Sequence, residues 1–184
     1  LNSKALSIFA ELSACVIDAA CHQPKGLVHR DYHSRNLMVP AGDAPLAVID
    51  FQDAIMGPVA YDAVSLLKDV YVVWPRPKQL VWLEYYWEHL VRQGQLGEGS
   101  WPQFIVWFDL IGLQRHVKIL GVFSRLWLRD DKPSYMRDIP VVIAYVREAC
   151  LLYRGSQPAI GVFWDWFEDS IMPTIERQDW YRPS

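Results

Sequence analysis

Side chains that can bind a metal ion or move a proton gather in two short polar segments, each beside a run of apolar residues. The first, the Asp31 loop, spans residues 29–36 and contains Asp31 and Asn36, while the second begins at Asp50, directly after the apolar residues 46–49. Carboxylate and amide oxygens suit Mg²⁺, which takes one or two carboxylates and completes its shell with water and phosphate oxygens. A further carboxylate can orient an acceptor hydroxyl and take its proton. Together the two segments suit a magnesium ion and a base beside an acceptor hydroxyl.

The elements that must position these segments follow from the apolar pattern. Apolar residues recur at helical spacing over residues 3–21, and Gln-Pro-Lys-Gly at 23–26 ends that helix. Three short apolar runs predict strands, and the turn-rich residues 40–45 between the last two predict a hairpin. Strands are expected at 27–28, 37–39 and 46–49, and helices near 60–73, 78–93, 101–127, 139–153 and 159–177.

The expected fold class is α+β, mostly α. The short strands are too few for a free-standing sheet, so they must lie on the helices and present their loops. We expect a single domain over residues 1–184, with a leading helix at 1–26, the polar loops at 27–58 and a helical body at 59–184. All nine tryptophans lie from Trp74 onward, in that body.

Composition and charge exclude several classes of protein. With 52% hydrophobic and 21% charged residues, the chain can bury a core and is not a disordered tail. A formal net charge of −3 argues against nucleic acid or an anionic membrane as partner, since such binding depends on a large positive field. The longest apolar stretch, 104–128, is interrupted by charged residues such as Asp109 and Arg125, so we expect no transmembrane helix. Three cysteines without a Cys-x-x-Cys pair favour a reducing, cytoplasmic location.

The spacing within the Asp31 loop resembles the catalytic loop of the protein-kinase-like superfamily. His29-x-Asp31-x-x-x-x-Asn36 matches the pattern H-x-D-x-x-x-x-N. Asp50, fourteen residues past Asn36, begins Asp-Phe-Gln, which is similar to the metal-binding Asp-Phe-Gly element with glutamine in place of glycine. The resemblance implies a kinase-like C-terminal lobe in which a small β-hairpin carries the catalytic and metal-binding loops.

Other residues resemble the small-molecule branch of that superfamily, the aminoglycoside phosphotransferase and choline kinase-like family. Protein kinases carry lysine two residues after the catalytic aspartate, whereas this chain has His33, as that branch does. Residues 57–66 resemble the segment that follows in that branch, and the protein-kinase Ala-Pro-Glu element is missing. Residues 50–54 and 112–118 look like the bacterial anomeric kinases of N-acetylmuramate and N-acetylglucosamine used in cell-wall recycling. The resemblance covers essentially the whole chain.

The resemblance implies a role for five residues. Asp31 would be the catalytic base, and Asn36 and Asp50 would hold Mg²⁺. His33 would lie near the transferred phosphoryl group, with an exposed loop histidine as an equal alternative. Asp62 would brace the Asp31 loop by accepting backbone N–H bonds, with a helix N-cap as the alternative. The implied cofactors are Mg²⁺ and ATP or another nucleoside triphosphate.

Three further residues are candidates for a role in the site, and each also has a purely structural interpretation. His29 is expected to support the base of the Asp31 loop through a hydrogen bond. Asp53 is a candidate for substrate binding, against the reading of a solvated loop carboxylate. Arg115 is a second candidate for substrate binding, against the reading of a solvated face or an ion pair on an apolar helix.

The resemblance also implies a second lobe. Kinases of this fold use a nucleotide-binding N-terminal lobe, which supplies a loop over the phosphates and a lysine paired with a glutamate. Only thirty residues precede Asp31, and they read as one helix, so we expect that lobe to be absent from this chain.

The expected function is ATP-dependent phosphorylation of a small hydroxylated acceptor, with an amino sugar phosphorylated at its anomeric hydroxyl as the favoured case. The same chemistry would serve an aminoglycoside, choline or homoserine. An alternative of a different class is a non-catalytic, pseudokinase-like binding module. The expected absence of a nucleotide lobe favours this alternative, whereas the complete set of Asp31, Asn36 and Asp50 argues against it.

Overall fold

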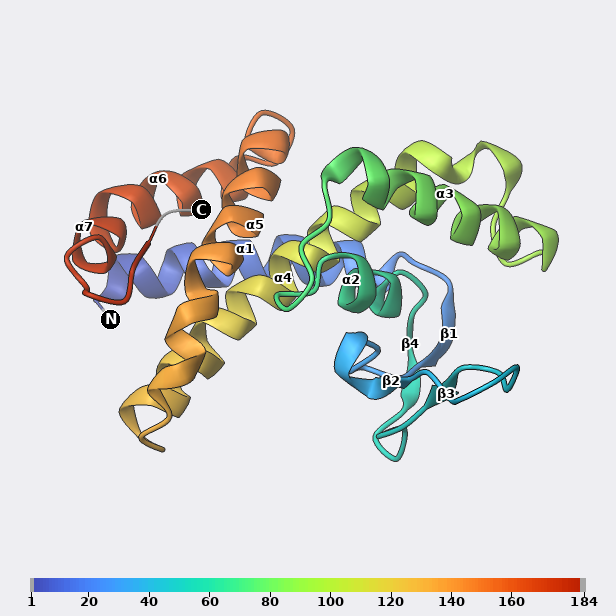
Figure 1. Cartoon of the computed structure of the whole chain (residues 1–184). Helices are drawn as coiled ribbons and strands as arrows, with labels where there is room; N and C mark the ends of the chain where they lie inside the picture. Colours follow the sequence, from blue (N-terminus) through green and yellow to red (C-terminus); the bar gives the residue numbers. More distant parts are fainter. Residues whose placement is uncertain (1, 183–184) are drawn as a thin grey trace. The chain divides into compact units, whose positions relative to one another are not determined.

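A computed structural model describes residues 2–182, which divide into two compact units (Figure 1). The loop unit comprises residues 20–111, and the helical unit comprises residues 1–19 and 112–184. Helices α1 (Ser3–Cys21) and α4 (Trp101–Leu128) each contribute residues to both units. The Asp31 loop and Asp50 belong to the loop unit.

The loop unit begins with strands and continues with helices. Its elements before α4 are β1 (Lys25–Val28), a 3-10 helix (Ser34–Asn36), β2 (Leu37–Met38), β3 (Ala47–Val48), β4 (Ile55–Pro58), α2 (Tyr61–Leu67), α3 (Arg76–Arg92) and a second 3-10 helix (Glu98–Ser100).

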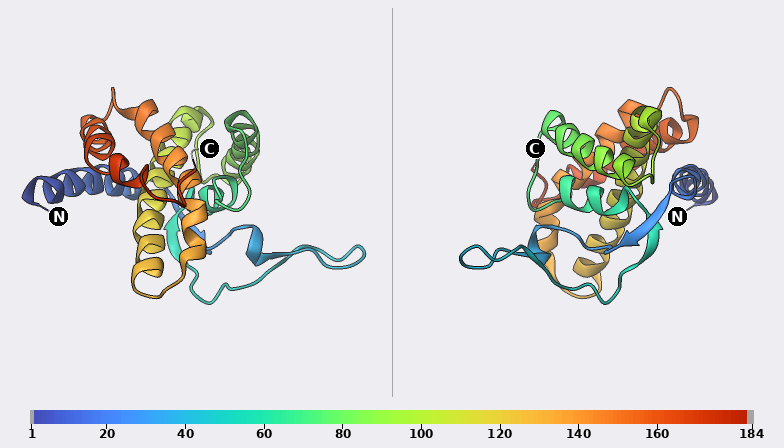
Figure 2. Two further views of the ribbon diagram at one scale, coloured as in Figure 1. Left: turned by 60° about the vertical axis from the view of Figure 1, so that its left-hand side comes forward. Right: turned by 90° about the vertical axis from the view of Figure 1, so that its right-hand side faces the viewer.

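Strands β2 and β3 pair as an antiparallel hairpin, with Leu37 opposite Val48 and Met38 opposite Ala47. This pairing confirms the hairpin predicted around residues 40–45, where turn-forming residues separate two apolar runs. The hairpin extends away from the helices of its own unit (Figures 1 and 2). Its two ends therefore carry the Asp31 loop on one side and Asp50 on the other.

Strand β4 pairs with β1, and the sequence pattern did not predict it. Val28 lies opposite Ile55 at one end of this antiparallel pair. Gly57 approaches Val28 so closely that a Cβ atom at position 57 would lie 3.2 Å from Val28 Cγ2. The strand ends in glycine and proline, which are depleted in strands, so its sequence resembles a loop.

The core of the loop unit is formed by its helices. Val64 and Leu67 on α2, Leu83 on α3, and Phe104 and Phe108 on α4 are buried together. Each large apolar side chain buried in this way stabilises the unit by roughly 1.5–3 kcal/mol. Val59, which directly follows β4, belongs to this core and attaches the β1–β4 pair to it. Such an attachment stabilises the pair, because isolated two-stranded ribbons are marginal in water.

The helical unit contains the remaining elements and has its own aromatic core. Phe163 contacts Phe9 of α1 and Phe167, with ring centroids 5.6 and 5.9 Å apart. The elements that follow α4 are a 3-10 helix (Pro133–Asp138), α5 (Ile139–Tyr153), α6 (Pro158–Ser170) and α7 (Met172–Ile175).

Two predicted helices are shorter in the structure. The helix expected at 60–73 ends at Leu67, and Asp69 Oδ1 then accepts the N–H of Tyr71 (3.2 Å), a local bond that competes with the helix. The helix expected at 159–177 is divided into α6 and α7, because Pro173 has no N–H to continue the ladder.

The α+β class with mostly helical content is confirmed by these elements. Among residues 2–182, no helix combines the length and the apolar character needed to cross a bilayer. A single lobe with internal boundaries after residues 26 and 58 stays a prediction.

A buried ion cluster fixes both ends of the segment between α2 and α3. Asp109 on α4 has no solvent exposure, and Lys68 Nζ lies 2.8 Å from its Oδ1. Arg76 donates to both oxygens, Nη1 to Oδ1 at 2.9 Å and Nη2 to Oδ2 at 2.7 Å. Burial acts to raise the pKa of Asp109, but the Arg76 hydrogen bonds and the Lys68 charge outweigh it and hold the pKa below the ordinary 3.8.

Replacing Asp109 by asparagine should strongly destabilise the chain. The Asp109→Asn variant removes the negative charge from a buried cluster with two cations, and we expect the free energy of unfolding to fall by about 3 kcal/mol in urea titrations at pH 7. Because the folded-state pKa is depressed, the wild-type advantage should be complete above pH 3.8 and shrink as the pH falls below it.

The control for this experiment is Glu88→Gln, which breaks the exposed pair of Glu88 with Arg92 at 3.7 Å. Exposed pairs of this kind contribute about 0.5 kcal/mol at most. Equal effects of the two substitutions would contradict the structural role assigned to Asp109.

Candidate functional site

The carboxylate of Asp62 holds the start of the Asp31 loop. Asp62 lies in the first turn of α2, and its Oδ2 accepts the N–H of His29 at 2.7 Å. Its Oδ1 accepts the N–H of Arg30 at 3.1 Å. Ala60 occupies the N-cap position of α2, so the carboxylate of Asp62 bonds to the loop rather than capping the helix as its N-cap residue. Two consecutive amides therefore bind one carboxylate, in hydrogen bonds strengthened by its charge.

The backbone is in the left-handed region on both sides of the site. Arg30, immediately before Asp31, has φ +77°, and Asp50 has φ +65°. Non-glycine residues adopt this region at an energetic cost, which the surrounding contacts must offset, and such residues cluster at functional sites. Both turns thus mark places where the chain is bent to present particular side chains.

His29 joins the Asp31 loop to the segment before Asp50. Its ring is buried, and Nε2 lies 2.9 Å from the carbonyl oxygen of Ile49. Because a carbonyl oxygen only accepts, Nε2 carries the proton in this bond. The edge of the ring also packs against Tyr32, with ring centroids 5.9 Å apart. His29 therefore supports the base of the loop through its side chain.

Asn36 connects three parts of the site. Its Nδ2 donates to the backbone oxygen of Asp31 at 2.9 Å, and its backbone oxygen accepts the N–H of Ile49 at 3.1 Å. Since Ile49 precedes Asp50, these bonds place Asp31, Asn36 and Asp50 at one edge of the hairpin. The amide orientation directs Nδ2 to the loop and leaves Oδ1 as an oxygen donor for a cation.

The carboxylates of Asp31 and Asp50 are exposed at this edge. Asp50 Oδ1 accepts a hydrogen bond from Gln52 Nε2 at 2.6 Å. Within residues 2–182, no three His, Cys, Asp or Glu side chains come together as a cage for a metal ion. The side-chain oxygens of Asn36 and Asp50 are ligands of the chemical type that Mg²⁺ takes, since Mg²⁺ uses few protein ligands and keeps waters or phosphate oxygens in its shell.

Three other sequence-predicted residues are less closely tied to this edge. His33 packs edge-on against Tyr71 (6.0 Å between centroids), and its buried Nδ1 has no hydrogen-bond partner in the described part of the chain. The side chain of Asp53 is exposed, while its backbone oxygen accepts from Arg30 Nη1 at 3.4 Å. Arg115 is buried on α4 in the helical unit, and the loop unit does not contain it.

Asp69 is a buried site residue that sequence reasoning missed. Its Oδ2 accepts from Ser34 Oγ at 2.8 Å and from Ser34 N at 3.4 Å, which fixes the 3-10 helix that leads to Asn36. Arg35 in the same 3-10 helix lies over the ring of Tyr71, at 3.4 Å from its centroid. The only available signal was an aspartate within an apolar stretch, inside a segment predicted to be helical.

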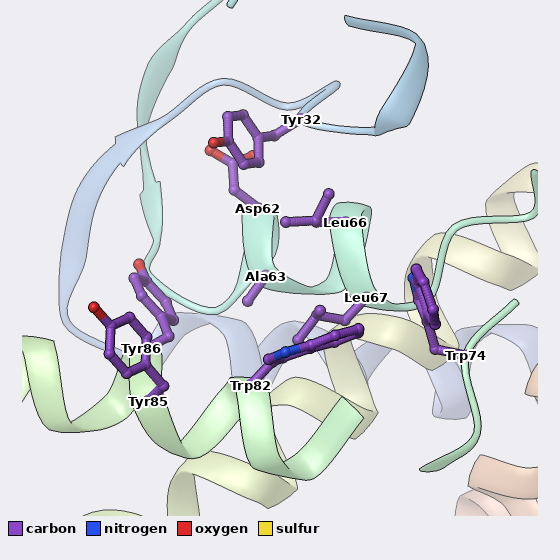
Figure 3. Close-up of a pocket in the computed structure, with 9 residues that line it drawn as sticks. All are labelled: Tyr32, Asp62, Ala63, Leu66, Leu67, Trp74, Trp82, Tyr85 and Tyr86. Atoms are coloured by element: carbon purple, nitrogen blue, oxygen red, sulfur yellow. The ribbon is translucent and has the colours of Figure 1, made fainter. Parts of the chain in front are cut away.

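An aromatic pocket of ≈ 680 Å³ lies between the Asp31 loop, α2 and α3 (Figure 3). Burial and, second, the charge of Asp62 raise the pKa of Tyr86, whose hydroxyl stays protonated and donates to Val59 O at 3.1 Å. The residues that line the pocket are Tyr32, Asp62, Ala63, Leu66, Leu67, Trp74, Trp82, Tyr85 and Tyr86.

Comparison with known proteins identifies a family for this chain. The family model of the phosphotransferase enzyme family matches residues 4–98, which include the Asp31 loop, Asp50 and α2. The chain belongs to the phosphotransferase enzyme family. The matched range also contains the pocket residues and Asp69.

Three curated relatives share the name N-acetylmuramate/N-acetylglucosamine kinase. The protein of Pseudomonas putida is 44% identical over 74% of this chain and 40% of its own length. The protein of Pseudomonas aeruginosa is 38% identical over 81% of this chain and 44% of its own length. The protein of Neisseria meningitidis is also 38% identical, over 83% of this chain and 45% of its own length. The chain therefore spans less than half the length of the curated relatives it matches.

Removing the carboxylate of Asp62 should release the start of the Asp31 loop. In Asp62→Ala, we expect amide hydrogen exchange at His29 and Arg30 to accelerate about tenfold and the free energy of unfolding to fall by about 2 kcal/mol, because two bonds to a charged acceptor are lost. Asp43→Ala changes an exposed aspartate in the hairpin loop and is the matched control. Unchanged exchange at both amides would contradict the bracing role.

Proposed function

We propose that this chain is the acceptor-binding lobe of a small-molecule kinase, which transfers the γ-phosphoryl group of ATP or another nucleoside triphosphate to an amino sugar. The observation that carries this proposal is the hydrogen-bonded junction of Asp31, Asn36 and the segment before Asp50. Membership of the phosphotransferase family supports the reaction class, and the names of the relatives support N-acetylmuramate and N-acetylglucosamine as acceptors.

In this proposal, Asp31 acts as the base. Its exposed carboxylate accepts the proton of the anomeric hydroxyl while that oxygen forms a bond to the γ-phosphorus. The bond from the γ-phosphorus to the bridging oxygen breaks, and a nucleoside diphosphate leaves. The hydrogen bond from Asn36 Nδ2 to the Asp31 backbone and the left-handed turn at Arg30 keep the carboxylate in position for an in-line attack.

Asn36 Oδ1 and the Asp50 carboxylate would hold Mg²⁺, which neutralises charge on the β- and γ-phosphate oxygens when bound. Asn36 is oriented for this role because its Nδ2 is already bonded to Asp31. Asp50 is presented by its left-handed backbone at the end of the hairpin. His33, two residues past Asp31, would lie near the transferred phosphoryl group.

Nucleotide binding requires residues that we assign to a second lobe, which packs on the hairpin side of the loop unit. Exposed apolar side chains there have no covering element within residues 2–182 and suit such an interface. They are Leu27, Val39, Phe51, Ile55 and Met56. The relatives are more than twice as long as the segments they share with this chain, which leaves room for such a lobe.

We also place the protein in the cytoplasm, where nucleoside triphosphates are available. Cys15, Cys21 and Cys150 are free thiols, which suits a reducing compartment. Burial raises the pKa of Cys150 to about 12. Burial and, second, the charge of Asp18 raise the pKa of Cys15 above its ordinary value. Neither side chain is therefore a reactive thiolate.

Replacing the base should abolish turnover without removing nucleotide binding. In the intact gene product, we expect Asp31→Asn to lower kcat for N-acetylglucosamine by about 10³-fold while the Kd for ATP changes less than about twofold, because a general base contributes to the chemical step. Asp43→Asn, an exposed carboxylate on the hairpin loop, should retain wild-type kcat. A wild-type rate in Asp31→Asn would remove Asp31 from its role as the base.

The 184-residue chain by itself should have almost no kinase activity. With ATP, Mg²⁺ and either amino sugar, we expect a rate below about one-thousandth of that of the intact gene product, because the lysine that positions the phosphates is supplied by the other lobe. A coupled assay for nucleoside diphosphate release measures this rate. Full turnover by the chain would refute the requirement for a second lobe.

A further inference from the structure

The aromatic pocket lies where the body of an acceptor must be if its hydroxyl reaches Asp31. Tyr32, which lines the pocket, follows Asp31 directly, so their Cα atoms are about 3.8 Å apart. Asp62, on the same wall, holds the amides of His29 and Arg30. The volume of ≈ 680 Å³ is within the range of roughly 300–1,000 Å³ that is typical of pockets for small ligands.

The walls of this pocket suit the apolar face of a sugar ring. Figure 3 shows Tyr32 and Asp62 at one end, with Trp82 and Tyr85 of α3 at the other and Trp74 to one side. Indole and phenol rings offer flat apolar surface together with a polar edge, which matches the C–H face and the hydroxyls of a pyranose.

Lys78 is not itself a lining residue, but it brings a positive charge to two tryptophans that line one side of the pocket. Its Nζ lies 4.5 Å from the ring centroid of Trp74 and 4.8 Å from that of Trp82. The two rings stand edge to face, 4.9 Å apart, and together they hold the ammonium group by cation–π contacts. Across residues 2–182, no carboxylate forms an ion pair with Lys78, so its charge is available to a ligand.

The two sides of the pocket therefore differ in charge. The carboxylate of Asp62 lies beside Tyr32, near the Asp31 loop, whereas the ammonium of Lys78 lies beside Trp74 and Trp82. A carboxylate on the acceptor is repelled from the first side and attracted to the second. N-acetylmuramate carries its carboxylate on a lactyl ether, at a ring carbon other than the anomeric one. It can therefore place its anomeric hydroxyl at the loop and its carboxylate at Lys78.

We propose that the aromatic pocket binds the acceptor sugar and that Lys78 pairs with the carboxylate of an acidic amino sugar such as N-acetylmuramate. N-acetylglucosamine has no carboxylate, so it uses the same aromatic walls without this ion pair. Lys78 is thus a residue that determines specificity between two acceptors of one reaction. This assignment rests on the proposed kinase function for the chemistry at Asp31, but sugar binding in the pocket can be measured without turnover.

The test is Lys78→Met in the intact gene product, since methionine keeps an apolar side chain against the two indoles and removes the charge. We expect KM and Kd for N-acetylmuramate to rise about tenfold, while those for N-acetylglucosamine and both kcat values stay within about twofold. Lys78→Arg keeps the charge and should restore most of the affinity for N-acetylmuramate. Lys25→Met removes an exposed lysine on β1 and is the matched control.

A second variant tests the aromatic wall at a ring outside the cation–π contacts of Lys78. Tyr85→Ala should weaken the binding of both sugars by a similar factor, of about tenfold, because the ring surface serves the shared pyranose. Circular dichroism checks that the variant is folded, and binding is followed by saturation-transfer NMR or calorimetry without nucleotide.

The outcomes separate this inference from the proposed function. If the wild type phosphorylates both sugars and Lys78→Met changes both KM values equally or neither, the role of Lys78 is refuted. If the wild type phosphorylates neither sugar but binds N-acetylmuramate in a way that Lys78→Met weakens, the kinase function fails and the pocket assignment stands. If the wild type binds neither sugar, the pocket assignment is refuted whatever the reaction.

Discussion

One carboxylate, that of Asp62, determines how the Asp31 loop leaves the sheet. Both of its oxygens are engaged, one by the amide of His29 and the other by the amide of Arg30. For two consecutive amides to point at the same carboxylate, the chain must turn sharply, and Arg30 accordingly has φ +77°. Asp31 follows that turn, so the direction of the proposed base is fixed by a residue on a helix. Because α2 is packed in the core through Val64, the loop is attached to the buried core of its unit.

A second set of bonds attaches the far end of the loop to the same unit. Asp69 holds Ser34, and the segment that carries Asp69 is fixed at both ends by the buried cluster of Lys68, Arg76 and Asp109. Charges buried in this way contribute little net stability, since their desolvation offsets their attraction. Their geometry is nevertheless specific, because a bidentate arginine and a buried lysine accept only one placement of the carboxylate. The cluster thus fixes the position of the segment that carries Asp69, and it adds little to the free energy of unfolding.

Much of this could be predicted from local pattern. The helix at 3–21, the hairpin around 40–45 and the beginnings of the later helices follow from apolar spacing and turn residues, which act over a few residues. Other features could not be predicted. Strand β4 is held by pairing with β1, almost thirty residues earlier, and its own sequence ends in glycine and proline. Asp109 appeared in the sequence only as an interruption of an apolar stretch, because its two cationic partners lie more than thirty residues before it.

The sequence by itself determined which residue types are available for chemistry and in what order: the spacing of Asp31, Asn36 and Asp50 and the helix-forming pattern around them. Those properties are local, so they are present in the chain before it folds. Only the tertiary structure decided that Asn36 bonds to the backbone of Asp31 and that His29 reaches Ile49. It also decided that an aromatic pocket with Lys78 beside it opens next to Tyr32. The bond between Asn36 and Asp31 spans five residues, but His29 and Ile49 are twenty residues apart and the pocket joins Tyr32 to residues of α2 and α3. The pocket depends on the packing of α2 and α3 in a common core, which no local pattern encodes.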